Sequence, residues 1–139
     1  MPVRDTYHEI VVRALEADGW AITADPLWLA YGNRDFYVDL AADYTALAAE
    51  KSGHKIAVEI KRLGGPSPLR ELEQAVGQFV LYRAVLAQLE PERRLYLAIP
   101  ESIYDELFTS RFGELVLRDV ALSLFTFDVS TERIVRWIE

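Results

Sequence analysis

The chain has 139 residues, of which 51% are hydrophobic, so residues 1–139 are long enough for a single domain with one apolar core. It contains no cysteine, which excludes disulfides and thiolate zinc sites, and it has neither a bilayer-spanning apolar segment nor a signal peptide at residues 1–5. The net charge of −7 argues against broad electrostatic binding of nucleic acid. Together these features predict a cytoplasmic protein with no membrane segment.

The first predicted element is a helix over residues 4–18. Its apolar residues recur at helical spacing, and Thr6 with Glu9 fits a capping box at its start. Gly19 is a typical residue after the last helical turn. Glu9 has a second interpretation, in which a carboxylate from the first helix supports a metal site, and the sequence leaves both interpretations open.

A carboxylate inside a predicted strand is the first sign of a site. Short strands are predicted at residues 20–22 and 27–31, which form one interrupted run, and at residues 36–42, which carry Asp39. Burying a carboxylate in a strand is unfavourable unless a cation pairs with it, so Asp39 indicates a metal ion or a salt bridge. Asp43, four residues further on, is a substitute for it.

The strand predicted at residues 55–61 is the centre of the proposed site. Apolar and polar side chains alternate along it, so Glu59 and Lys61 share one face while the aliphatic side chains face a core. A carboxylate and an ammonium at this spacing can reach the same ligand. A hairpin partner for this strand is predicted at residues 44–51, with a turn at residues 52–53.

The second half of the chain alternates between helices and strands. A long helix over residues 68–89 begins at Ser67-Pro68, and the apolar strand at residues 95–99 then favours a parallel crossover. Gln74 and Gln78 lie one turn apart on this helix, where they either support the site or form a polar surface. The remaining predicted elements are helices at residues 101–108 and 111–119 and strands at residues 122–127 and 133–138.

Asp39, Glu59 and Lys61 together suit the hydrolysis of a phosphodiester. Mg²⁺ or Mn²⁺ prefers oxygen ligands, which the two carboxylates and the backbone carbonyl of Ile60 can supply. The metal polarises the phosphate, and Lys61 orients the attacking water or offsets charge in the transition state. The basic residues around these positions are interpreted either as nucleic-acid contacts or as ordinary solvated charges: Lys51, Lys55, Arg62 and Arg70.

The order of these elements, α-β-β-β-α-β with an aspartate strand before a Glu-x-Lys strand, resembles the PD-(D/E)XK nucleases. The resemblance implies a restriction-endonuclease-like α/β fold with a mixed central sheet flanked by helices. It also implies catalytic roles for Asp39, Glu59 and Lys61, with Glu9 and the two glutamines in support. The alternative is a structural ion pair between Glu59 and Lys61, which predicts no metal binding.

A series of short motifs runs along nearly the whole chain: Asp18-Gly19-Trp20, Asp25-Pro26-Leu27, Gly32-Asn33-Arg34-Asp35, Tyr37-Val38-Asp39-Leu40, Ala48-Ala49-Glu50-Lys51, residues 55–61, Leu72-Glu73-Gln74-Ala75 with Gly77-Gln78, Leu95-Tyr96-Leu97-Ala98 and Ile134-Val135-Arg136-Trp137-Ile138. Together these motifs resemble the XisH family, the fdxN-element excision controlling factors found mainly in cyanobacteria. The resemblance implies a role in the programmed excision of a DNA element, beside a site-specific recombinase and a small partner, XisI.

Two functions follow from this resemblance, and the sequence leaves both open. One is a Mg²⁺-dependent nuclease that acts on DNA or RNA, for which a homodimer would suit the two strands of a duplex. The other is a non-catalytic assembly or regulatory factor that binds an XisI-type protein. The intact set of Asp39, Glu59 and Lys61 favours the first function, and the net charge of −7 favours the second.

Overall fold

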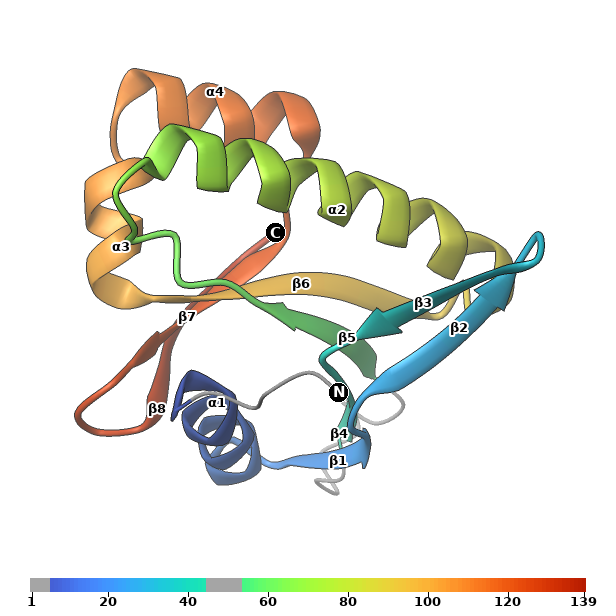
Figure 1. Ribbon diagram of the computed structural model, residues 1–139. Coiled ribbons are helices and arrows are strands. Elements are labelled where there is room, and N and C mark those ends of the chain that lie inside the picture. Colours follow the sequence, from blue (N-terminus) through green and yellow to red (C-terminus); the bar gives the residue numbers. More distant parts are fainter. Residues whose placement is uncertain (1–5, 45–53) are drawn as a thin grey trace.

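Helices cover both faces of a central β-sheet in the computed structural model, which describes residues 6–44 and 54–139 (Figure 1). The first helix lies on one face, and the other three pack on the opposite face. In chain order the elements are α1 (Thr6–Ala17), β1 (Trp20–Ala24), β2 (Leu27–Tyr31), β3 (Arg34–Val38), β4 (Leu40–Tyr44), β5 (Lys55–Ile60), α2 (Pro68–Leu89), β6 (Arg93–Pro100), α3 (Glu101–Leu107), α4 (Arg111–Val120), β7 (Leu124–Asp128) and β8 (Arg133–Ile138).

The central sheet has six strands in the order β1-β4-β5-β6-β7-β8. The middle strands β5, β6 and β7 run parallel, and the remaining neighbours pair antiparallel. The long helix α2 connects β5 to β6, so the predicted parallel crossover is confirmed. The expected α/β fold with a mixed central sheet flanked by helices is confirmed as well.

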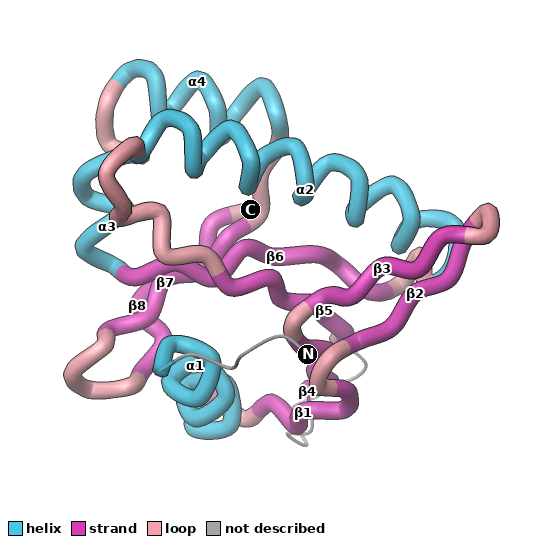
Figure 2. The backbone as a smooth tube through the Cα atoms, viewed as in Figure 1, coloured by secondary structure: helices cyan, strands magenta, loops and turns pink. Residues whose placement is uncertain are grey.

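The strands β2 and β3 form a separate two-stranded hairpin that runs beside α2 (Figure 2). The prediction that β2 continues the strand before Asp25-Pro26 is wrong, because β1 pairs with β4 whereas β2 pairs with β3. Pro26 has no backbone N–H with which to extend a ladder of hydrogen bonds. The inner face of the hairpin is apolar, and Leu29 and Val38 on it are buried in the core below α2.

The predicted strand over residues 36–42 is interrupted at Asp39. Residues before it belong to β3 in the hairpin, and residues after it belong to β4 in the central sheet. The interruption has a clear cause, since the backbone N–H and the carboxylate of Asp39 both bond to β5 rather than to a neighbour of β3. Asp39 is therefore the residue at which the chain passes from one sheet to the other.

Two apolar cores fill the spaces between the sheet and its helices. The core on the α2 side includes Phe79 and Leu97, and the core on the α1 side includes Val11 and Phe125. β6 is buried from Leu95 to Pro100, as expected for a central strand covered on both faces. The cores fix the middle of the sheet and leave the strand ends available for polar groups.

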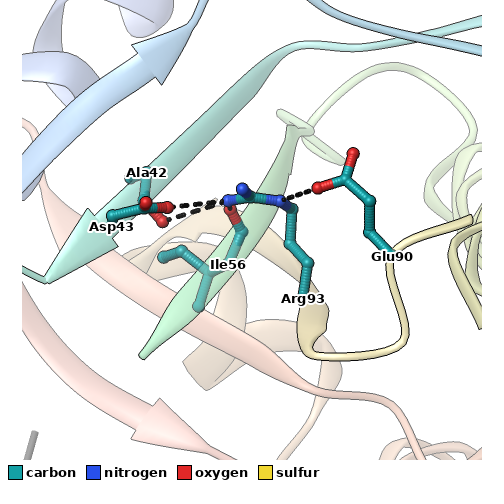
Figure 3. A network of polar contacts seen from close by, with 5 residues as sticks. All are labelled: Ala42, Asp43, Ile56, Glu90 and Arg93. Carbon is teal, nitrogen blue, oxygen red and sulfur yellow. Dashed lines mark hydrogen bonds and ion pairs between the residues drawn. The ribbon is translucent and has the colours of Figure 1, made fainter. Parts of the chain in front are cut away.

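The end of the sheet at which β5 begins is held by Arg93 (Figure 3). Its Nη1 donates to Asp43 Oδ1 at 3.0 Å and to the carbonyls of Ile56 and Ala42 at 3.1 and 3.4 Å. Its Nε donates to Glu90 Oε1 at 2.8 Å. One guanidinium thus ties β4, β5 and the residue after α2 to the start of β6.

The remaining predictions compare simply with the structure. The helices expected at residues 68–89, 101–108 and 111–119 and the two closing strands are confirmed to within two residues at each end. The strand expected at residues 44–51 and its turn lie outside the described residues, except for Tyr44, which ends β4. Within residues 6–44 and 54–139, no helix combines the length and the apolar character needed to cross a bilayer.

Candidate functional site at the end of β5

Asp39 is joined to the end of β5 by two hydrogen bonds, one to the Glu59 side chain and one from the Ile60 backbone. The Asp39 N–H donates to Glu59 Oε1 at 3.1 Å, and the Ile60 N–H donates to Asp39 Oδ2 at 2.8 Å. The antiparallel register of Leu40 with Val58 places these two acidic residues next to each other where β4 begins and β5 ends. The two carboxylates predicted to act together therefore lie together.

The Glu59 carboxylate is buried with only 6% of the residue exposed. Its pKa is raised to about 7, first by burial and then by the charge of Asp39, against the opposing influence of Lys61. A carboxylate in this position is stabilised by a bound proton or by a cation. The preference of Glu59 for a bound proton or a nearby cation is the main chemical property of the site.

Lys61 supplies a positive charge at the rim of the same site. Its Nζ lies 3.6 Å from Glu59 Oε2, and its side chain is 28% exposed. Its backbone N–H donates to the carbonyl of Ala98 at 3.0 Å, which extends the pairing of β5 with β6 by one residue. The ammonium therefore lies close to the Glu59 carboxylate and still reaches solvent.

The residues present fit a hard divalent cation. Two neighbouring carboxylates, of which Glu59 has a raised pKa, favour binding of a cation. Mg²⁺ commonly takes one or two protein carboxylates and completes its shell with water and substrate oxygens. Among the described residues there is no cluster of three His, Cys, Asp or Glu side chains, so a cage made only of side chains is not what this part of the chain offers. Asp39, Glu59 and the carbonyl of Ile60 would be the protein ligands.

A glutamine and a tyrosine on α2 lie next to this site. Gln78 Nε2 donates to the hydroxyl of Tyr82 at 3.0 Å. Burial raises the pKa of Tyr82, and the charges of Glu59 and Asp39 raise it further although Gln78 opposes them, which places the phenol within the field of both carboxylates. Gln78 Oε1 is buried and has no hydrogen-bond partner among the described residues, so it is a polar atom available to a bound group.

Sequence reasoning selected Gln78 but missed Tyr82. The signal was present, since Tyr82 follows Gln78 by four residues and side chains at that spacing meet on a helix. Gln74, the other predicted supporting residue, is exposed one turn earlier on α2. The structure therefore separates the two glutamines by burial, with Gln78 half-buried beside Tyr82 and Gln74 facing solvent.

The predicted basic residues do not gather in one place. Lys55 lies at the opposite end of β5 from Glu59, in register with Arg93, and Arg62 places its guanidinium 4.5 Å over the ring of Tyr7 on α1. Arg70 is exposed in the first turn of α2, and Lys51 lies outside the described residues. A continuous basic groove through these four residues is therefore absent from the described part of the chain.

The two other predicted carboxylates have local surroundings of their own. Glu9 is exposed on α1, where its charge contributes to raising the pKa of Arg13. Asp43 is bonded to Arg93 at the far end of β5, so it is not a substitute for Asp39. The role of Glu9 as a supporting residue stays a prediction.

A cavity of about 380 Å³ lies away from these carboxylates. Its lining includes Trp20, Arg94, Tyr96 and Trp137, at the end of the sheet where β5 begins. Several of its polar atoms bond within the chain, since the Tyr96 hydroxyl donates to Glu139 and the Trp20 indole N–H donates to Asp18 Oδ2 at 3.3 Å. None of its lining residues belongs to the Asp39, Glu59 and Lys61 site, so this cavity and the perturbed carboxylate lie in different places, and we take the carboxylate as the candidate site.

Nearly the whole chain, including the residues of this site, is similar to known proteins. The family model described as XisH protein matches residues 1–135. The crystal structure of an XisH family protein from Nostoc punctiforme is 37% identical with a TM-score of 0.87, and covers 97% of this chain and 100% of its own. An fdxN element excision controlling factor protein from Anabaena variabilis is also 37% identical, with a TM-score of 0.88 and coverage of 98% and 100%. No significant match to a curated protein was found.

Proposed function

The chain belongs to the XisH family, and on that premise we propose that it takes part in the excision of a DNA element as a Mg²⁺-dependent nuclease. The observation that carries this proposal is the pair of carboxylates, Asp39 and Glu59, held together with a Glu59 pKa of about 7. A carboxylate with a perturbed pKa next to a lysine, like Glu59 next to Lys61, is typical of functional sites. The name of the Anabaena relative, an excision controlling factor, supports a DNA-rearrangement role.

Each residue of the site has a distinct part in this function. The backbone donors at Asp39 and Ile60 orient the two carboxylates, which would hold the cation together with the Ile60 carbonyl. Mg²⁺, when bound, supplies positive charge to the phosphate and lowers the pKa of the attacking water. Lys61 orients that water or offsets the negative charge that develops on the phosphate oxygens. Water adds across one P–O bond, which leaves a phosphate monoester and a hydroxyl group.

The test is cleavage of plasmid DNA, and separately of RNA, by the purified chain with Mg²⁺ or Mn²⁺. Glu59→Ala and Lys61→Ala should each lower the cleavage rate by at least about a hundredfold, since each removes a group that acts on developing charge. Glu92→Gln, an exposed carboxylate at the other end of the sheet, is the matched control and should cleave like the wild type. Full activity in either site variant would contradict this mechanism.

A second function is favoured by the net charge of −7 and by exposed apolar side chains on two helices, Leu81 on α2 and Phe112 on α4. In it the chain is a non-catalytic assembly or regulatory factor, with an XisI-type protein and the site-specific recombinase system as its partners. Purified chain and an XisI-type protein should co-elute at micromolar concentration, and Leu81→Glu should weaken the complex. Separate elution would remove this function's main support, and the same column would show whether the chain alone is a homodimer.

A further inference from the structure

The outer face of the β2–β3 hairpin carries two aromatic side chains that the rest of the molecule leaves uncovered. Trp28 is 60% exposed and Tyr37 is 55% exposed, although both residues lie within regular strands. They are paired directly across the hairpin, so their rings are neighbours on one surface. The opposite face, with Leu29 and Val38, is buried and anchors the hairpin on the core below α2.

The indole of Trp28 is held in place on this surface. Its Nε1 donates to Asp35 Oδ1 at 3.1 Å, a contact between the two strands of the hairpin. An exposed ring with a fixed orientation loses less conformational entropy when a flat partner binds to it. The Trp28 ring is thus preorganised for stacking on the outer face of the hairpin.

This aromatic pair is close to the candidate site along the chain. Tyr37 precedes Asp39 by two residues, which is roughly 7 Å along an extended chain. That length corresponds to about two stacked nucleotides.

We propose that Trp28 and Tyr37 form a stacking platform for unpaired bases of a nucleic-acid substrate whose phosphate reaches Asp39, Glu59 and Lys61. The proposal rests on the proposed nuclease function and adds a substrate class to it, namely a single strand or an opened segment of a duplex. Stacking on aromatic rings is a major source of affinity for single strands. It also explains how a chain with a net charge of −7 and scattered basic residues binds a polyanion.

The size of the surface favours bases over a folded protein partner. Two five-residue strands give a face roughly 17 Å long and about 10 Å wide, or roughly 170 Å². A stable protein interface needs about 800 Å² on each partner, whereas a base needs only one ring face. The small aromatic face is therefore matched to nucleobases.

The test measures binding of a fluorescein-labelled single-stranded DNA oligonucleotide of mixed sequence by anisotropy, in EDTA so that no metal-dependent cleavage intervenes. Trp28→Ala and Tyr37→Ala should each weaken binding by between about fivefold and about a hundredfold. Tyr37→Phe retains a ring and should bind within about twofold of the wild type. Phe112→Ala removes an exposed aromatic side chain from α4 and is the matched control, with unchanged affinity. Because both platform residues are exposed, the variants should keep the wild-type melting temperature.

The possible results separate this proposal from the nuclease function. Equal DNA binding by the wild type and by the variant that carries both Trp28→Ala and Tyr37→Ala overturns the platform. If Glu59→Ala loses cleavage in the separate cleavage assay, the proposed nuclease function is still supported. Cleavage with an unchanged KM in the double variant also overturns it. A change from dimer to monomer in Trp28→Ala, with unchanged affinity for DNA, would identify a self-association surface and overturn it too. A wild-type chain that neither binds nor cleaves any strand removes both proposals.

Discussion

The two ends of β5 carry opposite electrostatic arrangements. Where β5 begins, Arg93 lies between two carboxylates, Asp43 and Glu90, and also bonds two backbone carbonyls (Figure 3). Burial lowers the pKa of Arg93, but its bonds to these carboxylates outweigh that effect and raise it. Where β5 ends, Glu59 lies beside Asp39 instead, and its pKa is raised to about 7.

The difference teaches how to distinguish structural charges from functional ones in this fold. At the Arg93 end the groups of opposite charge satisfy one another, and the network is complete without a ligand. At the Glu59 end two groups of like charge lie side by side, with Glu59 buried and Asp39 half-buried, and the charge of Asp39 helps to raise the pKa of Glu59 despite the nearby Lys61. The first arrangement stabilises the sheet, and the second favours a cation from outside.

The largest expected effect on stability comes from breaking the complete network. Arg93→Met should lower the free energy of unfolding by about 2–3 kcal/mol, somewhat below the 3–5 kcal/mol typical of a fully buried pair because Asp43 and Glu90 are each about one third exposed. Chemical denaturation measures this change. Arg94→Met, at the exposed neighbouring position, should change it by less than about 1 kcal/mol. Equal losses in both variants would contradict a special role for Arg93.

The next effect is a gain in the free energy of unfolding, and its size depends on pH. Because the folded-state pKa of Glu59 is raised above its ordinary value, ionisation destabilises the fold as pH rises from about 4.5 to about 7. Glu59→Gln removes that charge, so the variant should be more stable than the wild type by about 2–3 kcal/mol at pH 8 and no more stable below pH 4.5. Denaturation curves across this pH range, with Glu92→Gln as the control, measure the difference, and a constant difference would contradict the assigned cause.

The smallest effect is stabilisation by metal. At a concentration tenfold above its Kd, Mg²⁺ should add about 1.4 kcal/mol to the wild-type stability at pH 8. It should add less at pH 5, where protons compete for Glu59. Thermal melts should show no Mg²⁺ shift in Glu59→Gln or Asp39→Asn and an undiminished shift in Asp43→Asn, the matching aspartate of the other end. A shift that survives in Glu59→Gln would place the metal elsewhere.

The sequence predicted the elements that depend on local patterns. Alternation along β5 identified the shared face of Glu59 and Lys61, and the length and apolar character of residues 95–99 identified a doubly covered strand. The start of α2 at Ser67-Pro68 was also correct, although Ser67 makes no side-chain capping bond. These features are properties of neighbouring residues and need no knowledge of the rest of the chain.

What the sequence did not predict depends on contacts between distant residues. Asp39 interrupts its strand because of bonds to β5, and Asp43 is committed to Arg93, fifty residues away. Likewise, the dispersal of Lys55, Arg62 and Arg70 follows from the topology of the sheet and could not be seen from their closeness in sequence. Tyr82 is the exception, since its helical spacing from Gln78 was visible.

Asp39 is the only residue between β3 and β4, and it forms one of the two joints between the hairpin and the central sheet, the other being Asp25-Pro26 between β1 and β2. Both its N–H and its carboxylate are tied to β5, which means that the joint and the acidic group move together. A movement of β3 relative to the central sheet therefore also displaces this carboxylate. The orientation of the hairpin and the geometry around Glu59 are therefore mechanically coupled through Asp39.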